Sequence, residues 1–135
     1  ENFKGKDKLT KQEIRRRAME AAKLVQIESY LERIVRGSGG SLQGLADELF
    51  LSSRQVERLI RKLYGKSFRG CLFEMRMKYA VQLLESGRSV QDTASLLSYS
   101  SVNAFHAAFR NYYHLSPVRY VRMKNAKPKR KGDTQ

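Results

Sequence analysis

Residues 90–117 read VQDTASLLSYSSVNAFHAAFRNYYHLSP, and residues 42–67 read LQGLADELFLSSRQVERLIRKLYGKS. Each stretch has apolar residues at helical spacing, then a short break, then a second apolar run at helical spacing. The two patterns superimpose with an offset of 48 before the break and 49 after it, and a loop can absorb the extra residue. The matching pairs include Ala46 with Ala94, Leu49 with Leu97, Val56 with Phe105, and Arg61 with Arg110. The repeat therefore predicts two helix-turn-helix units, the layout in which a second helix enters the major groove of DNA.

A long helix predicted over about 68–86 lies between the two units, which are predicted over about 42–64 and 90–113. Ser116 and Pro117 are typical of a helix start, because serine caps a helix and proline fits its first turn. No stretch alternates with a period of two, so the predicted fold class is all-α.

The segment before the first unit carries two apolar stripes. Thr10 and Glu13 have the spacing of a capping box, which predicts an accessory helix or linker within residues 1–23. A second stripe predicts the first helix of the domain over 24–36, ended by the Gly/Ser cluster at 37–40. The first stripe has no assigned partner, and we expect the isolated chain to be mainly monomeric; its members are Ile14, Ala18, Ala21 and Val25.

The length and amino-acid composition of the chain limit the classes of function that it can have. The 135 residues suffice for one domain with a modest helical core. The 27 Lys and Arg against 13 Asp and Glu give a net charge of +14, which favours a polyanionic partner such as nucleic acid. No apolar run approaches the roughly 18 residues of a membrane span and no signal peptide opens the chain, so a cytoplasmic protein is predicted.

Catalytic and metal-binding patterns are not found in the sequence. Cys71 is the one cysteine, which excludes an internal disulfide, and we expect it to be a core thiol. His106 and His114 have no third ligand at metal spacing. No nucleophile–base arrangement or phosphate-binding glycine loop is present, so the sequence predicts neither an enzyme nor a cofactor.

The second helix of the first unit has one polar face, predicted to carry Arg54, Glu57, Arg58 and Arg61. Arginine can bind guanine O6 and N7 together, and glutamate can accept a hydrogen bond from cytosine N4. We therefore predict base contacts from Ser53, Arg54, Glu57 and Arg58, and phosphate contacts from Arg61 and Lys62. The alternative is a solvated face on which Glu57 pairs with Arg61.

The equivalent face of the second unit is less rich in base-reading side chains. Asn103 can bind adenine with two hydrogen bonds, whereas Ala107 offers only a methyl group. We predict base contacts from Asn103 and His106, and phosphate contacts from Ser101 and Arg110. The second unit is therefore expected to read fewer bases than the first.

Together these residues resemble the DNA-binding domain of the AraC/XylS family of bacterial transcription regulators. The resemblance covers roughly residues 24–123 and includes Arg76, Ala80 and Leu83-Leu84 of the central helix. It is most specific in the second unit, at Val90, Ala94, Leu97, Tyr99, Asn103, Phe105, Phe109, Arg110, Leu115, Ser116, Pro117, Tyr120 and Arg122.

The resemblance implies seven helices, arranged as two homeodomain-like helix-turn-helix subdomains joined by a rigid central helix. It implies a sequence-specific regulator of double-stranded DNA, most often an activator that contacts RNA polymerase, with its recognition helices in successive major grooves. Members usually carry an effector-binding or dimerising domain ahead of this one. Either that domain has been removed or the chain is a short, single-domain type, and the absence of an opening methionine favours removal.

Four positions depart from the family pattern, and one of them is Ala107, which stands where many members carry a long polar side chain. Phe50, Ser98 and His114 stand where the family usually has glycine. A residue with a side chain is strained there if the backbone has a positive φ.

Two alternatives to specific DNA binding stay open. One is a basic module that binds nucleic acid non-specifically, on the nucleoid or on RNA, and the other is a helical protein-interaction domain. Residues 124–135 are predicted to be a basic flexible tail, which either contacts phosphates or only aids solubility.

Overall fold

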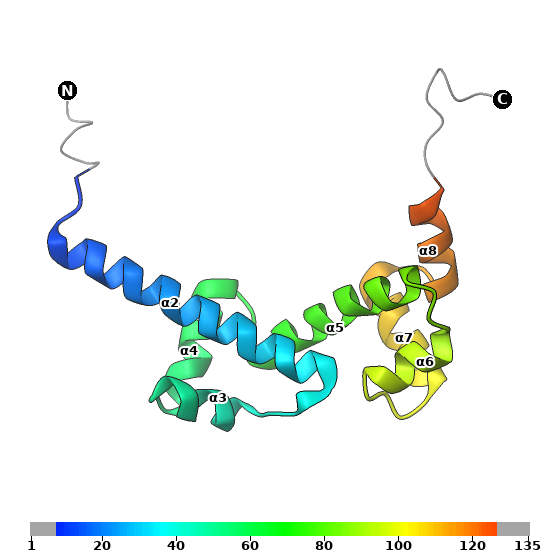
Figure 1. Cartoon of the computed structure of the whole chain (residues 1–135), viewed down its shortest axis with the longest axis horizontal. Helices are drawn as coiled ribbons and strands as arrows, with labels where there is room; N and C mark the ends of the chain where they lie inside the picture. Colours follow the sequence, from blue (N-terminus) through cyan, green and yellow to red (C-terminus); the bar gives the residue numbers. More distant parts are fainter. Residues whose placement is uncertain (1–7, 127–135) are drawn as a thin grey trace, which may run out of the picture.

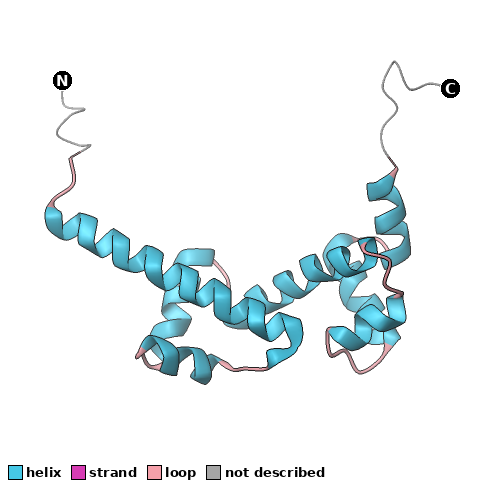
Figure 2. Cartoon of the chain, viewed as in Figure 1, coloured by secondary structure: helices cyan, strands magenta, loops and turns pink. Residues whose placement is uncertain are grey.

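The computed structural model describes residues 8–126 of the chain. This part contains only helices, which confirms the all-α prediction (Figure 2). In chain order they are α2 (Lys11–Arg33), the π-helical turn η1 (Ile34–Ser38), α3 (Leu42–Leu49), α4 (Ser53–Tyr64), α5 (Phe68–Glu85), α6 (Val90–Leu96), α7 (Val102–Tyr113) and α8 (Pro117–Asn125). Figure 1 shows two bundles, one of α2, α3 and α4 and the other of α6, α7 and α8, with α5 running from one to the other.

A hydroxyl side chain starts each of the seven α-helices in the described residues. The oxygen of the capping residue accepts a hydrogen bond from a backbone N–H of the first helical turn, which otherwise has no partner. The capping residues are Thr10, Ser41, Ser52, Ser67, Ser89, Ser101 and Ser116. The starts predicted at Thr10 and Ser116 are confirmed, and Pro117 occupies the first turn of α8.

The structure differs from the expectation of two separate helices before the first unit. Residues 11–33 form one continuous helix, α2. The reason is that no glycine or proline interrupts this stretch, so its backbone hydrogen bonds continue across Lys23. The helical path ends at the predicted Gly/Ser cluster, where Gly37 has a φ of 106°. The division of the chain at residue 23 into a linker and a domain stays a prediction.

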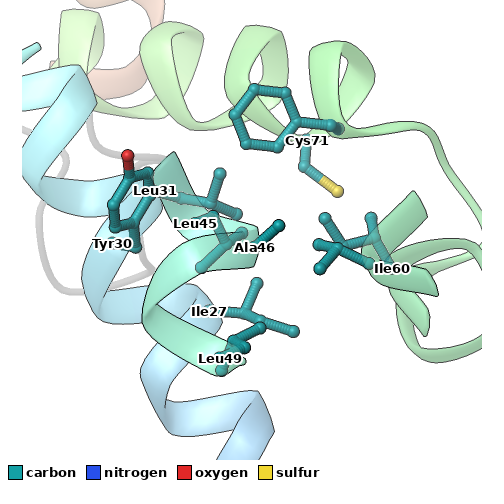
Figure 3. Packing of buried hydrophobic residues seen from close by; sticks show 10 residues of the cluster. Ile27, Tyr30, Leu31, Leu45, Ala46, Leu49, Ile60 and Cys71 are labelled. Atoms are coloured by element: carbon teal, nitrogen blue, oxygen red, sulfur yellow. The ribbon is translucent and has the colours of Figure 1, made fainter. Parts of the chain in front are cut away.

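The first core lies where α2, α3, α4 and the start of α5 meet (Figure 3). Ile27, Leu45 and Ile60 are completely buried at its centre. The hydroxyl of Tyr30 accepts a hydrogen bond from the backbone N–H of Ser41 at 3.2 Å, which ties α2 to the start of α3. Cys71 is buried against this core, as predicted, and burial raises the pKa of its thiol.

The second core is aromatic. Phe105 and Phe109 of α7 are completely buried, with ring centroids 5.8 Å apart. Tyr113 and Tyr120 pack on Phe109 and connect α7 to α8. Val35 of η1 is also buried here, so the end of the first bundle's leading helix contacts the second core.

Three residues with side chains have a left-handed backbone. The φ angles are 58° at Phe50, 65° at Ser98 and 65° at His114. These are the positions at which the family usually has glycine, and they lie one or two residues after the last residue of α3, α6 and α7. A side chain in this conformation costs about 1–2 kcal/mol. The chain therefore carries strain at three helix ends.

Replacing Phe50 by glycine is expected to raise the free energy of unfolding by about 0.5–1 kcal/mol. The phenyl ring is 93% exposed, so its removal loses little packing. Urea unfolding followed by circular dichroism measures the change, with Phe50→Ala as the control that removes the ring and keeps the strain. Equal stabilities for the glycine and alanine variants would contradict the explanation by backbone strain.

Candidate nucleic-acid interface

The second helix of each unit is held in the same way. A capping serine, Ser52 or Ser101, starts the helix after a short turn. Val56 and Ile60 of α4 are completely buried, as are Phe105 and Phe109 of α7. Each helix therefore has one side fixed in a core and the opposite side facing solvent, the arrangement that a recognition helix needs.

Three arginines occupy the solvent face of α4. Arg54, Arg58 and Arg61 are exposed, and none of them forms an ion pair with another residue of the described chain. Their spacing places them on one side of the helix over two turns. Guanidinium groups with no internal acceptor are available to bind guanine edges or phosphates.

Glu57 is less accessible than the three arginines. The side chain is half-buried, and its Oε1 accepts a long hydrogen bond of 3.4 Å from the backbone N–H of Phe68. Phe68 is the first residue of α5, whose unpaired N–H groups favour a nearby carboxylate. The position of Glu57 therefore supports a role in fixing α5 against α4.

Two further predicted residues have internal partners. The hydroxyl of Ser53 donates a hydrogen bond to Gln43 Oε1 at 2.7 Å, which ties α4 to α3. Lys62 Nζ lies 2.8 Å from Glu20 Oε2 of α2, and this contact lowers the pKa of the Glu20 carboxyl. The spacing of residues within one helix cannot predict such a contact, because Glu20 and Lys62 are 42 residues apart in the sequence.

The solvent face of α7 carries Asn103, Ala107 and Arg110, all exposed. His106 is half-buried at the side of this face. Ser101 accepts a hydrogen bond from the backbone N–H of Ala104, and its own hydroxyl hydrogen can still be donated. The structure thus places Asn103 and Arg110 on one exposed face of α7 and leaves His106 less accessible.

Glu74 of α5 connects the two units, and sequence reasoning missed it. Its carboxylate forms ion pairs with Lys66, in the loop after α4, and with Lys78, one turn further along α5. Tyr112 of α7 donates a hydrogen bond to Glu74 Oε2 at 3.3 Å. The hydrogen bond with Lys66 is the main cause of the lowered pKa of the Glu74 carboxyl. One carboxylate therefore joins the loop that follows α4 to α7.

The described residues contain neither a metal-binding cluster nor a membrane-spanning helix. They contain no group of three or more His, Cys, Asp or Glu placed to hold a metal ion. None of their helices is both long and apolar enough to span a bilayer. Of the basic tail predicted over 124–135, Lys124 and Asn125 belong to α8, and residues 127–135 lie outside the described residues.

A family model described as a helix-turn-helix domain matches residues 45–123. The chain is 33% identical over 98 residues to the HTH-type transcriptional regulator NimR of Escherichia coli K12, an alignment covering 71% of this chain and 36% of NimR. It is 36% identical over 81 residues to the HTH-type transcriptional regulator GadX of Escherichia coli O6:H1, covering 59% of this chain and 29% of GadX. The chain thus spans about a third of the length of these curated relatives.

Solved structures share the fold. A transcriptional regulator from Chromobacterium violaceum, described as an AraC-type DNA-binding domain-containing protein, superimposes with a TM-score of 0.72 at 27% identity, covering 83% of this chain and 99% of that one. The DNA-binding domain of AdpA, solved in complex with a target DNA, gives a TM-score of 0.65 at 26% identity, covering 77% and 93%. In both, the alignment includes most of the solved chain.

Proposed function

Because the chain belongs to the AraC-type family of helix-turn-helix regulators, we propose that it binds double-stranded DNA sequence-specifically as part of a transcription regulator. The observation that carries this proposal is the pair of equivalently held helices, α4 and α7, whose solvent faces carry unpaired side chains able to contact bases and phosphates. The DNA-bound structure of the AdpA domain, which has the same fold, supports it.

The two helices are proposed to enter successive major grooves on one side of the duplex. The central helix α5 has 18 residues and is therefore about 27 Å long. This length is comparable to the ~34–36 Å that separates equivalent groove positions one turn apart. A rigid spacer of this size suits two half-sites about one helical turn apart.

Selection of binding sites from random duplexes tests the proposal. We expect enrichment of a bipartite motif with two short conserved blocks about one helical turn apart. Equal affinity for all duplexes, or equal affinity for RNA, would instead support the non-specific nucleic-acid module. The absence of binding to any nucleic acid would support the protein-interaction domain.

The first unit is proposed to read bases and the second mainly to anchor the complex. Arg58→Ala is expected to relax base preference in one half-site, since a bidentate arginine–guanine contact discriminates by about 1–3 kcal/mol. Arg110→Ala is expected to weaken binding to all sequences about equally, because phosphate contacts carry little base information.

A scan of single base substitutions against each variant measures this difference. Arg88→Ala, which removes an exposed arginine from the turn between α5 and α6, is the control for loss of one charge. If Arg58→Ala keeps every base preference while Asn103→Ala loses several, the two units have the opposite roles.

Glu74 is proposed to set the spacing between the half-sites. Inserting one base pair turns the second groove by about 34° and moves it by ~3.4 Å, which a rigid protein cannot follow. Glu74→Gln weakens both ion pairs of this side chain and is expected to reduce the affinity penalty for such inserted sites. Base preference within each half-site is expected to be unchanged.

Tyr112→Phe removes only one of the hydrogen bonds to Glu74, so it should shift the spacing penalty in the same direction by a smaller amount. Gel-shift titrations on duplexes with shortened, normal and lengthened spacers measure the penalty. A Glu74→Gln variant with the wild-type penalty would show that packing around α5 alone sets the spacing.

We also propose that the regulator is an activator that acts in the cytoplasm and contacts RNA polymerase. The faces of the domain away from α4 and α7 are available for such a contact while DNA is bound. An effector or dimerisation domain ahead of this one is proposed from the resemblance, since the curated relatives are about three times longer than their aligned part.

A further inference from the structure

The outer face of α2 carries an apolar stripe that no described residue covers. Ile14 is 54% exposed and Val25 is 63% exposed, and Ala18 and Ala21 between them are exposed as well. The intervals of four, three and four residues are those of a coiled-coil seam over two heptads. On a helix in solution such a stripe is typical of a surface that packs against another helix.

The stripe lies on the side of α2 opposite to the core. Ile27 and Leu31 point into the first core, and Glu20 pairs with Lys62 of α4 on that same side. Figure 1 shows the N-terminal half of α2 extending past α3 and α4, away from the second bundle. A helix docked on the stripe would therefore contact neither the core nor the solvent face of α4.

When a second copy of the helix runs in the opposite direction, each residue of the stripe lies opposite a residue of matching type. Ile14 and Val25 are equally distant from the midpoint between Met19 and Glu20, and so are Ala18 and Ala21. The same midpoint relates Lys11 to Glu28, which lie at the two ends of the stripe with opposite charges. Both are exposed, and neither forms an ion pair with another described residue.

From this symmetry we propose that the stripe is a self-association surface, on which α2 of a second copy of this chain packs in the antiparallel direction. Ile14 then contacts Val25 of the partner subunit, and Lys11 pairs with Glu28 of the partner subunit at both ends. The two-fold axis passes through the midpoint of the stripe, as an isologous interface requires. An in-register parallel pair would instead place Lys11 against Lys11 and Glu28 against Glu28.

The association is expected to be weak because the contact surface is small. Four side chains from each copy, two of them alanine, bury far less than a stable protein–protein interface. A dissociation constant of about 0.1–1 mM is expected, which agrees with a chain that is mainly monomeric at low micromolar concentration. Two copies bound to neighbouring DNA sites are at high local concentration, and there the contact becomes effective.

Charge exchange tests the ion pairs. Lys11→Glu and Glu28→Lys, made separately in the full chain, each place two like-charged pairs at the interface and should weaken self-association about fivefold. The double variant restores opposite charges and should recover wild-type association. Sedimentation equilibrium without DNA measures all four proteins, and circular dichroism confirms their fold. A double variant as weak as the single ones would overturn the pairing.

Disulfide trapping tests the direction. The antiparallel arrangement brings Ile14→Cys of one copy next to Val25→Cys of another, whereas two Ile14→Cys chains keep their thiols about 16 Å apart along the helices, too far for a disulfide. Oxidation of a mixture should therefore give cross-linked dimers faster than either variant alone. The wild-type chain, whose Cys71 is buried, is the control.

Cross-linking of each variant alone as fast as the mixture would overturn the antiparallel arrangement. No cross-linking in the mixture, together with a monomeric wild-type chain at about 1 mM, would overturn self-association and assign the stripe to a different partner.

Discussion

The central helix α5 is buried in two cores at once, and the placement of both recognition helices depends on it. Phe68 and Cys71 pack in the first core, and Met77 and Ala80 pack in the second. Leu72 and Met75, between them, contact both cores. Because one rigid helix contributes to both sets of contacts, neither bundle can rotate about α5 without exposing apolar surface to water. This constraint limits how far α4 and α7 can move relative to one another.

Internal pairing of the acidic side chains decides where the positive charge is available. Among the described residues, Glu20, Glu48 and Glu74 form ion pairs between elements, and Glu57 accepts a hydrogen bond at the start of α5. The arginines on the solvent face of α4 are left without such partners, although the unit that carries them contains several carboxylates. Their field is therefore directed outward, where a polyanion can approach.

At the strained helix ends, the free-energy cost of a left-handed backbone is set against the burial of neighbouring apolar side chains. Phe50, Ser98 and His114 adopt a left-handed backbone that glycine would adopt freely. Each of them ends a helix where the chain must turn sharply into the next element, and burial of the neighbouring helices holds the turn closed. Leu49 and Leu97, next to the first two strained residues, are buried in the two cores. Burial of the residue before each of these two turns thus offsets part of the cost of the strained backbone.

The sequence alone determined the helices of the two units and their order, because helix starts and ends depend on groups within a few residues of one another. The serine at 116, the glycine cluster at 37–40 and the repeated apolar spacing of 42–67 and 90–117 were sufficient to predict the two units and the all-α fold. The same local spacing grouped Glu57 with the arginines of α4. Tertiary structure decided which of these polar residues have internal partners, since the partner of Glu57 lies at the start of α5 and that of Lys62 lies on α2. It also revealed the role of Glu74, because contacts between residues far apart in the chain depend on the path of the folded backbone, which helical periodicity does not encode.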